Sequence, residues 1–329
     1  MRIKKPLQKL LRQTGFLCIS LVLRLPLWIL LFLVRPGKPV GYLFVIYPGH
    51  KKDVIEFCPK WLAYSPIFMG RPTIGGMISN GTAKRGLVLV VPNTVGEMRA
   101  DKKMCQAIQR RLLRVQRLTG ARAIALAGQM PGVFLRHGLK LEKPFVTGVR
   151  GTVYSIVETI ETLTAQKSAL TSGTMVVVGV GHMGGEVIDY LQDLSWEIHG
   201  IDIRRHRDKI LLPDEGEKVL AQADMVVVLT PKGSDFAPYM KHLKPGCLVV
   251  DDTHPRLHAT VSGLKLYKVA VGLPGTFFYP RLPGYRRDWL PGCVVEAIYA
   301  AATGSFGSDP LPVFIERARQ LGYYAHLDH

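Results

Sequence analysis

The stretch Thr174-Met-Val-Val-Val-Gly-Val-Gly-His-Met-Gly-Gly-Glu-Val-Ile-Asp-Tyr-Leu191 decides the fold of this chain. A short apolar strand runs into Gly179-x-Gly181-x-x-Gly184, and a helical pattern follows. In a dinucleotide-binding loop the first glycine makes the tight turn, the second lets the backbone approach a pyrophosphate, and the third lets the helix pack on the strand. The helix N-terminus then faces the phosphates. The stretch predicts a Rossmann-type, doubly wound parallel sheet.

A second strand, Glu197-Ile-His-Gly-Ile-Asp202, ends in an acid 18 residues after Gly184. This is close to the spacing of the carboxylate that binds the ribose of a dinucleotide. We therefore expect the cofactor to contact the loop and this acid. The expected contact residues are Gly179, Gly181, His182, Met183, Gly184 and Asp202.

The residues after Asp202 leave the choice of cofactor open. Asp202 favours a free ribose 2′-hydroxyl and repels a 2′-phosphate. Arg204, Arg205 and Arg207 follow it and can clamp such a phosphate. The alternative is that these arginines form a solvated basic loop.

Two further strands are expected to end at the same crevice, because ligands of such sheets bind beyond the carboxyl ends of the strands. The strand that begins at Ala223 ends at Thr230 and Pro231, which we expect beside the nicotinamide. The strand that begins at Cys247 leads to His254, a candidate proton donor whose alternative is a surface histidine. Cys247, at the start of its strand, is expected in the core.

The remainder of the chain from Gly41 also alternates strands and helices. Apolar runs predict strands at 42–47, 87–91 and 121–127, and helical spacing predicts helices at 104–118 and 152–169. The expected organisation is an N-terminal hydrophobic segment (1–40), a smaller α/β substrate domain (41–150), a linker helix (151–170), the nucleotide-binding domain (171–285) and C-terminal helices that pack back on the substrate domain (286–329).

Composition narrows the class of protein further. With 329 residues, 47% hydrophobic, the chain can bury a full core, so a disordered protein is excluded. Its net charge of +18 favours an anionic partner. Nucleic acid is not expected, because the arginines are dispersed and accompany no recognition motif. The five cysteines form no Cys-x-x-Cys, so no metal site and no disulfide framework are predicted.

The N-terminal segment is apolar from Gly15 to Val34, interrupted by Arg24 and Pro26, and has basic residues on both flanks. Because the usual charge asymmetry of a spanning helix is missing, we expect residues 1–38 to lie in the cytoplasmic leaflet of a membrane. A spanning helix, a signal peptide and a buried core helix are the alternatives. The expected location is cytoplasmic, peripheral or monotopic at the inner face of a membrane.

Cys293 follows Pro291-Gly292 and opens an alanine-rich helical stretch. Unpaired backbone N–H groups at a helix start favour a thiolate and can hydrogen-bond a developing oxyanion, which suits acyl transfer. The alternative is a small buried core residue, because free cysteine packs as a hydrophobe.

From Tyr42 to His326 the sequence resembles the long-chain acyl-ACP reductases, which convert a fatty acyl thioester into a fatty aldehyde. The likeness is carried, in order, by the segments 44–50, 125–128 and 146–148 with Thr152, by the glycine loop, by Asp251-Asp-Thr-His-Pro255 and by Cys293. The resemblance implies a nicotinamide-binding domain of shikimate dehydrogenase type, NADPH as reductant and an acyl-enzyme on Cys293.

The main expectation is thus an NAD(P)H-dependent reductase of an acyl thioester, with Cys293 and His254 as catalytic residues and NADH as a possible substitute for NADPH. An acidic acyl carrier protein would suit the basic surface. The first alternative is a dehydrogenase of a small hydroxy or keto acid, which needs no cysteine. The second is a non-catalytic, membrane-associated protein that senses the dinucleotide. The oligomeric state stays open.

Overall fold

The computed structural model describes residues 40–57, 60, 70–79, 85–166, 172–192, 195–204, 210–258, 261 and 263–327. The chain divides into two compact units. The first unit comprises Met1–Gly148, Pro274–Leu282 and Cys293–Asp309, and the second comprises Val149–Leu273, Pro283–Gly292 and Pro310–His329. The expected membrane segment, residues 1–38, lies outside the described residues.

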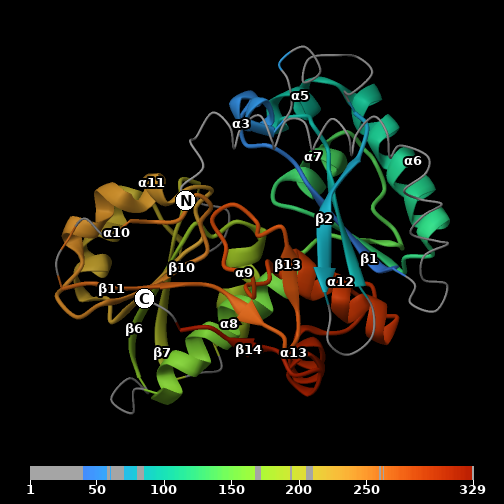
Figure 1. The fold of residues 1–329 in the computed structure, drawn as a ribbon. Coiled ribbons are helices and arrows are strands. Elements are labelled where there is room, and N and C mark those ends of the chain that lie inside the picture. The colour runs from blue at the N-terminus through green and yellow to red at the C-terminus, as the bar shows by residue number, and fades with distance from the viewer. Residues whose placement is uncertain are drawn as a thin grey trace, which may run out of the picture. The chain divides into compact units, whose positions relative to one another are not determined.

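The first unit is built on a six-stranded sheet of order β13-β2-β3-β1-β4-β5 (Figure 1). Its strands are β1 (Val40–Ile46), β2 (Thr73–Ser79), β3 (Arg85–Val90), β4 (Ala123–Leu126), β5 (Phe145–Val146) and β13 (Phe277–Tyr279). Four of them, β3, β1, β4 and β5, pair in parallel, whereas β2 pairs antiparallel with both of its neighbours, β3 and β13. The parallel strands therefore end at one common edge, which positions the loops that follow them.

The helices that the structure describes in this unit are α3 (Lys51–Phe57), α5 (Val95–Ala100), α6 (Lys102–Thr119), α7 (Met130–Arg136) and, apart from its first residue, α12 (Gly292–Thr303). The Asp101 side chain caps α6 by accepting from the Met104 backbone N–H, and Gly120 ends the helix in the left-handed conformation. Its buried stripe, which includes Ile108 and Leu112, packs with residues of the sheet such as Leu89. The amphipathic helix predicted at 104–118 is confirmed.

The second unit holds a parallel sheet of order β11-β10-β9-β6-β7-β8. Its strands are β6 (Gly173–Val178), β7 (Trp196–Ile201), β8 (Ile210–Leu211), β9 (Met225–Val228), β10 (Leu248–Asp251) and β11 (Lys265–Lys268). The chain forms the central strand β6 first and then adds β7 and β8 on one side of it. It then crosses to the other side of β6 and adds β9, β10 and β11. The doubly wound Rossmann-type sheet expected from the sequence is confirmed.

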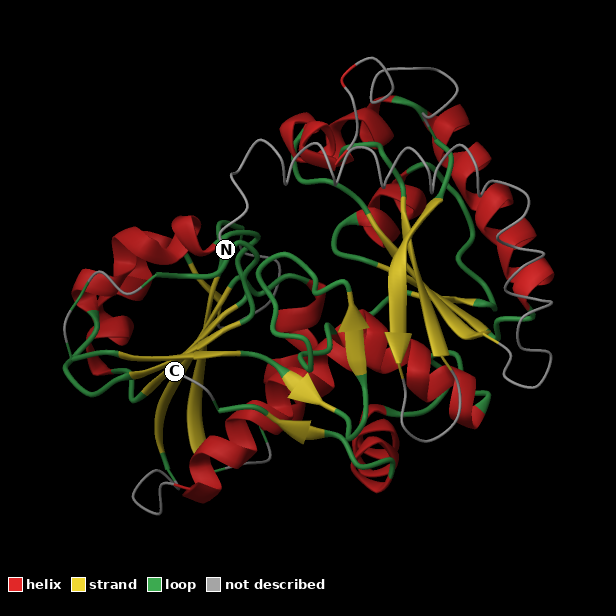
Figure 2. Ribbon diagram, viewed as in Figure 1, coloured by secondary structure: helices red, strands yellow, loops and turns green. Residues whose placement is uncertain are grey.

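Helices accompany this sheet, as the secondary-structure colours of Figure 2 show. They are α8 (Val149–Gln166), α9 (His182–Leu191), α10 (Pro213–Gln222), the short α11 (Gly233–Phe236), the 3₁₀ turn η2 (Ala237–His242) and α13 (Leu311–Gln320), and β12 (Val271–Gly272) pairs with β14 (Tyr324–Ala325). The core beneath α10 and η2 includes Val226, Leu220 and Met240. In α8 the apolar positions Val153, Ile156 and Ile160 are buried, as their spacing predicted.

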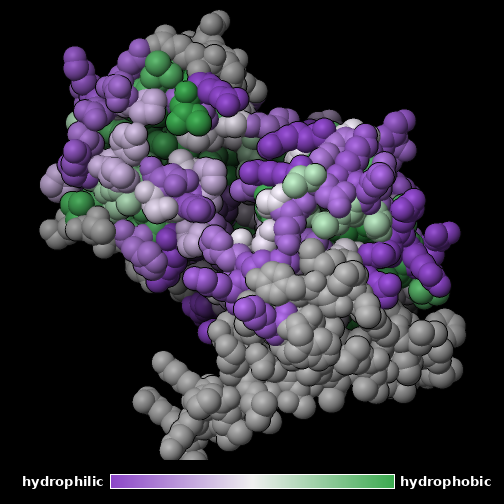
Figure 3. Space-filling model, turned by 90° about the horizontal axis from the view of Figure 1, so that it is seen from above, coloured by the Kyte–Doolittle hydropathy of each residue, from purple (hydrophilic) through white to green (hydrophobic). Residues whose placement is uncertain are grey.

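Hydrophilic side chains cover most of the described surface in the view of Figure 3, and hydrophobic ones form only small patches there. Of the helices built from described residues, none combines the length and the apolar character that crossing a bilayer requires.

Candidate active site

The glycine loop of the second unit has the geometry that a dinucleotide needs. Gly179 has a φ of +91°, and a Cβ there would lie 2.9 Å from the backbone of Leu229. A Cβ on Gly184 would lie 2.7 Å from the Gly179 carbonyl oxygen, so this glycine lets α9 pack on β6. Gly181, the N-cap of α9, has open space within 4 Å of its Cβ position. The loop leaves room for a pyrophosphate at the helix N-terminus.

The neighbouring residues of the loop are arranged around α9. The His182 side chain is 75% exposed, and its Nε2 lies 3.9 Å from Glu186 Oε1. Glu186 is fixed by Arg150, whose Nη1 lies 2.9 Å from its Oε2. Met183 is half-buried. The predicted cofactor contacts of His182 and Met183 stay predictions, and the exposure of His182 leaves it accessible to a ligand.

Asp202 follows β7, and its Oδ1 accepts a hydrogen bond of 3.2 Å from the Arg204 backbone N–H. This bond shapes the turn without using the Arg204 guanidinium, which is exposed. Arg205 and Arg207 lie outside the described residues. Asp202 and Arg204 therefore stand together at the end of β7, where a ribose would lie.

Thr230 and Pro231 follow β9, the strand next to β6. The Thr230 hydroxyl donates to the Lys232 carbonyl oxygen at 2.9 Å, and Pro231 is exposed. Since β9 is parallel to β6, these residues and the glycine loop share one edge of the sheet. The edge is the one at which such folds bind their ligands.

The loop after β10 is held by a buried carboxylate. Asp251 accepts hydrogen bonds from the backbone N–H groups of Thr253, at 2.8 Å, and Leu257, at 2.9 Å. Lys268, the last residue of β11, donates to the carbonyl oxygens of Asp251 and Thr253 at 3.0 and 2.7 Å. These bonds fix residues 251–257, and with them His254, at the same edge of the sheet.

His254 is exposed, and its ring lies 5.4 Å from that of Tyr285. Partial burial and the Lys268 ammonium lower the pKa of His254, so it is neutral at pH 7 and can accept a proton. Burial raises the pKa of Asp252 to about 6, opposed by Lys268 and reinforced by Asp251. A pKa in this range suits a general acid or base.

Sequence reasoning did not select Asp252 or Arg256, which follow β10 on this loop. The sequence signal for Asp252 was the pair of acids Asp251-Asp252 at the end of an apolar strand. Asp251 holds the loop through its hydrogen bonds, and Asp252 with its raised pKa is a candidate for proton transfer. Arg256 is exposed and offers a cation for an anionic substrate.

A second group of polar side chains gathers in the first unit, beyond the carboxyl ends of its parallel strands. Tyr47 follows β1, and its hydroxyl accepts a 3.0 Å hydrogen bond from the Gln129 backbone N–H, just after β4. The Gln129 Oε1 accepts from Arg99 Nη2 at 2.6 Å. Burial and the nearby Cys293 raise the pKa of the Tyr47 phenol, which therefore stays protonated at neutral pH.

Cys293 belongs to the same group. It is buried, 8% exposed, at the second residue of α12. Gly148, which follows β5 and has a φ of +85°, packs against it so closely that a Cβ on Gly148 would lie 2.7 Å from the Cys293 Cβ. The structure thus brings together segments 44–50, 125–128 and 146–148 with Cys293. The thiol has the helix-start position that was expected, and its catalytic role stays a prediction.

The other described cysteines lie in the core. Cys247 is fully buried, and burial raises the pKa of its thiol to about 12, which confirms the prediction of a core position. Burial also raises the pKa of Cys105 to about 11. Neither thiol is poised to react at neutral pH. Among the residues that the structure describes, no group of three His, Cys, Asp or Glu side chains could hold a metal ion.

Residues 154–241, all in the second unit, match the family model described as D-isomer specific 2-hydroxyacid dehydrogenase, NAD binding domain. This part of the second unit is similar to an NAD-binding domain. The match covers 88 of the 329 residues of the chain and includes the glycine loop, Asp202, Thr230 and Pro231. The expectation of a nicotinamide dinucleotide, NAD(P)H, is confirmed. No curated protein matches the chain.

The solved structures to which the chain is similar include three oxidoreductases. A transhydrogenase from Sinorhizobium meliloti is 15% identical over 36% of this chain and 47% of that chain, with a TM-score of 0.30. An NAD-dependent formate dehydrogenase from Staphylococcus aureus is 10% identical over 44% of this chain and 52% of that chain, with a TM-score of 0.27. An L-tryptophan dehydrogenase from Nostoc punctiforme is 10% identical over 87% of this chain and 80% of that chain, with a TM-score of 0.40. The chain spans about half the length of the first two.

The matching family model is one of hydroxyacid dehydrogenases and not of acyl-ACP reductases. The match supports an NAD(P)-dependent oxidoreductase, and it favours the hydroxy acid or keto acid alternative over the acyl thioester that the sequence resemblance implied.

Proposed function

We propose that this protein is an NAD(P)H-dependent oxidoreductase that interconverts a small hydroxy acid and its keto acid. The observation that carries the proposal is the match of residues 154–241 to the NAD-binding domain of D-isomer specific 2-hydroxyacid dehydrogenases. The glycine loop supports it, because Gly181 leaves open the space that a pyrophosphate takes. When bound, the nicotinamide supplies or accepts the hydride.

The chain's own residues at the edge of the second sheet fit the remaining tasks. His254 is neutral at pH 7 because its pKa is lowered, so it can take the proton of a substrate hydroxyl during oxidation and return it during reduction. Asp252 is a second candidate for this proton transfer, with its pKa at about 6. The exposed Arg256 guanidinium would hold the substrate carboxylate.

The test measures oxidation of NADH and NADPH by the full chain with a panel of 2-keto acids. His254→Ala is expected to lower kcat/KM by about 100-fold or more, because general acid–base catalysis contributes at least that much. Cys293→Ser is the matched control and is expected to keep its activity on keto acids. A His254→Ala protein with full activity would overturn the assignment of His254.

The second candidate function is the reduction of an acyl thioester. It is favoured by the position of Cys293 at a helix start beside Tyr47 and Gly148. In this reaction the thiolate attacks the acyl carbonyl, the carrier thiol leaves with a proton, and hydride transfer to the new thioester releases an aldehyde and restores the thiolate. An acyl carrier protein would be the donor.

A mass measurement separates the two functions. The full chain is incubated with a long-chain acyl thioester and no nicotinamide, and the intact mass is recorded. A gain of one acyl group that Cys293→Ser abolishes, together with NADPH oxidation by the thioester and none by keto acids, would replace the hydroxy acid proposal with the acyl thioester one. An unchanged mass, with keto acid activity present, is the expected result.

A further inference from the structure

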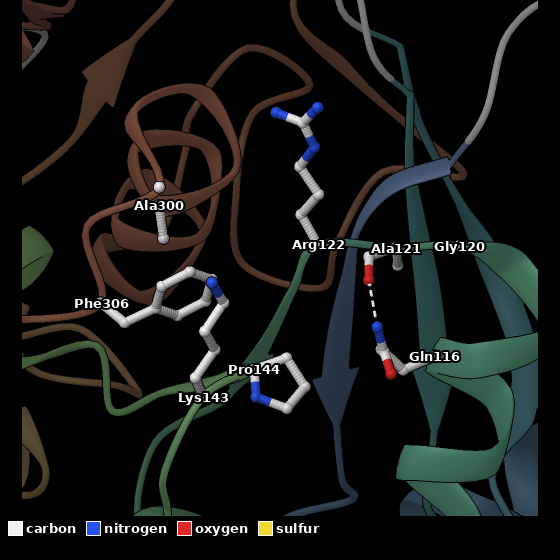
Figure 4. Close-up of a pocket in the computed structure, with 9 residues that line it drawn as sticks. Gln116, Gly120, Ala121, Arg122, Lys143, Pro144, Ala300 and Phe306 are labelled. Carbon is white, nitrogen blue, oxygen red and sulfur yellow. Dashed lines mark hydrogen bonds between the residues drawn. The ribbon is translucent and has the colours of Figure 1, made fainter.

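A hollow of about 500 Å³ lies in the first unit, at the amino-terminal edge of its parallel strands (Figure 4). Its walls come from the residues before β4 and β5 and from the end of α12. The lining residues that matter here are Ala121, Arg122, Lys143, Pro144, Ala300 and Phe306. Because Tyr47 and Gln129 follow β1 and β4, the hollow and the Tyr47–Cys293 group occupy opposite edges of one sheet.

The hollow combines an apolar wall with two cations. Ala300 and Phe306 belong to the apolar wall, and the Lys143 Nζ lies 5.1 Å from the centre of the Phe306 ring. Arg122 donates from Nη1 to the Ala301 carbonyl oxygen at 3.2 Å, and most of its guanidinium N–H groups are left to bind an anion. The described residues that line the hollow include no aspartate or glutamate. Such a lining suits an anion that carries an apolar chain.

This edge of the sheet is also where the apolar N-terminal sequence joins the fold. The Arg122 backbone N–H donates to the Gly41 carbonyl oxygen at 2.8 Å, so the hollow adjoins the start of β1. The apolar stretch 15–34 precedes β1 by only a few residues in the sequence. Leu118, in the last turn of α6 before the hollow, is 56% exposed, beside the basic Arg117. Exposed apolar and basic side chains thus gather here.

Glu142 is the acidic residue next to Lys143 in the chain. Its Oε1 lies 3.8 Å from the Lys140 ammonium, and both side chains are largely exposed. The Lys140 charge offsets that of Glu142, so the edge keeps its positive character around Arg122 and Lys143.

We propose that the hollow binds an anionic phospholipid, with the phosphate held between Arg122 and Lys143 and the acyl chains against Ala300 and Phe306. A free phosphate would leave the apolar wall exposed to water, whereas a lipid covers both parts of the lining. Basic residues at a bilayer surface gain from the negative lipid headgroups. The lipid would come from the membrane that the N-terminal sequence favours.

A lipid bound in the hollow would also orient the opposite edge of the sheet, which carries Tyr47 and Cys293. α6 runs from Lys102 to Thr119 and reaches the hollow through Gly120 and Ala121. Its 18 residues span about 27 Å at ~1.5 Å per residue. A lipid in the hollow would therefore leave the Tyr47–Cys293 edge turned away from the bilayer.

The experiment uses the full chain in a nonionic detergent, titrated calorimetrically with dihexanoyl-phosphatidylglycerol below its micelle concentration. Arg122→Gln combined with Lys143→Gln is expected to weaken binding by roughly 30-fold, because each basic residue near an anionic lipid surface contributes about fivefold and the two contributions multiply. Phe306→Ala is expected to weaken it about tenfold, through loss of apolar contact. Thermal unfolding midpoints confirm that each variant is folded.

The matched control removes the same charge from the other end of α6. Lys102→Gln combined with Lys103→Gln is expected to bind the lipid as the parent chain does, since both side chains are exposed at the start of the helix. Dihexanoyl-phosphatidylcholine and glycerol phosphate are expected to bind at least tenfold more weakly than the anionic lipid.

Three results would overturn the proposal. The first is unchanged lipid affinity in the Arg122 and Lys143 double variant. The second is equal affinity for glycerol phosphate and for the lipid, which would make the hollow a plain anion site. The third is equal affinity for the zwitterionic and anionic lipids, which would leave the two cations without a role. None of these results depends on the proposed oxidoreductase activity.

Discussion

Glycines in the loops after parallel strands have different surroundings in the two units. In the second unit, Gly181 faces open space at the start of α9. In the first unit, Gly148 faces the Cys293 Cβ, and Gly128 faces the Tyr47 hydroxyl oxygen, with the added Cβ 2.7 Å away in each case. A glycine in a loop after a parallel strand therefore leaves room for a ligand in one unit and admits a side chain in the other.

The difference shows two uses of a glycine in a loop that follows a parallel strand. An open glycine lets a cofactor phosphate approach the backbone N–H groups of a helix start. A glycine with a neighbour at its Cβ position lets a side chain, here Cys293 or Tyr47, pack against the backbone, where its orientation is fixed. The following substitutions test this contrast, beginning with the largest expected effect.

Gly181→Val is expected to weaken NAD(P)H binding by about 100-fold or more, because the new side chain fills the space that the pyrophosphate needs. Its backbone φ of −58° is one that a valine accepts, so the melting temperature should stay within a few degrees of the parent value. Fluorescence titration with NADPH and thermal unfolding measure the two quantities. Retained binding would show that Gly181 does not face the cofactor.

Gly184→Val is the contrasting variant for the same loop. Its Cβ would lie 2.7 Å from the Gly179 carbonyl oxygen, which cannot move without displacing the strand end. This protein is expected to lose stability as well as cofactor binding, by about 2–4 kcal/mol in urea unfolding. Equal stability of the two valine variants would remove the distinction between an open and a filled glycine.

Gly148→Ala tests the filled position in the first unit. The left-handed backbone, with φ of +85°, and the contact with Cys293 should together lower the free energy of unfolding by about 2–4 kcal/mol. Gly138→Ala is the matched control, since Gly138 has a φ of +73° but nothing within 4 Å of its Cβ position. It should lose only about 1 kcal/mol. Urea denaturation of the three proteins measures the difference.

Asp252→Asn tests the carboxyl at the edge of the second sheet. The pKa of Asp252 is raised to about 6 in the folded chain, so folding favours the protonated carboxyl. The parent chain should therefore lose stability as the pH rises from about 4 to 6. Above pH 6 the asparagine variant should be more stable by about 1–3 kcal/mol, and near pH 4 the two should agree. Asp214→Asn, at an exposed position in α10, serves as the control and should show no such gain.

Arg204→Ala is expected to have the smallest effect. The hydrogen bond from its backbone N–H to Asp202 survives the substitution, so only the guanidinium is lost. NADPH affinity should fall by roughly tenfold and NADH affinity should not change, as for the loss of one charged contact to a phosphate. Lys218→Ala removes an exposed cation elsewhere in the unit and should change neither. Equal losses for both cofactors would mean that Arg204 does not touch the 2′-phosphate.

Much of the fold and of the cofactor site could be predicted from local sequence. The strand and glycine pattern from Thr174 to Leu191 fixed the β6–α9 unit, because turn, approach and packing each require glycine at one position. The amphipathic stripes of α6 and α8 likewise predicted these helices. The antiparallel pair of β2 and β13 was not predicted, since β13 has only three residues and pairs with a strand almost 200 residues earlier in the chain.

By itself, the sequence determined the Rossmann sheet, its dinucleotide and the core position of Cys247. Each of these predictions depends on residues that are close together in the sequence and on the spacing of glycines and apolar residues among them. Only the tertiary structure decided which polar groups meet. It placed Tyr47 beside both Gln129 and Cys293, left Asp252 with a raised pKa, and formed a basic, apolar hollow from residues before β4 and β5 and at the end of α12. The physical reason is that pKa, burial and cavities arise from packing between segments distant in the chain, and the chemistry of one short segment does not specify them.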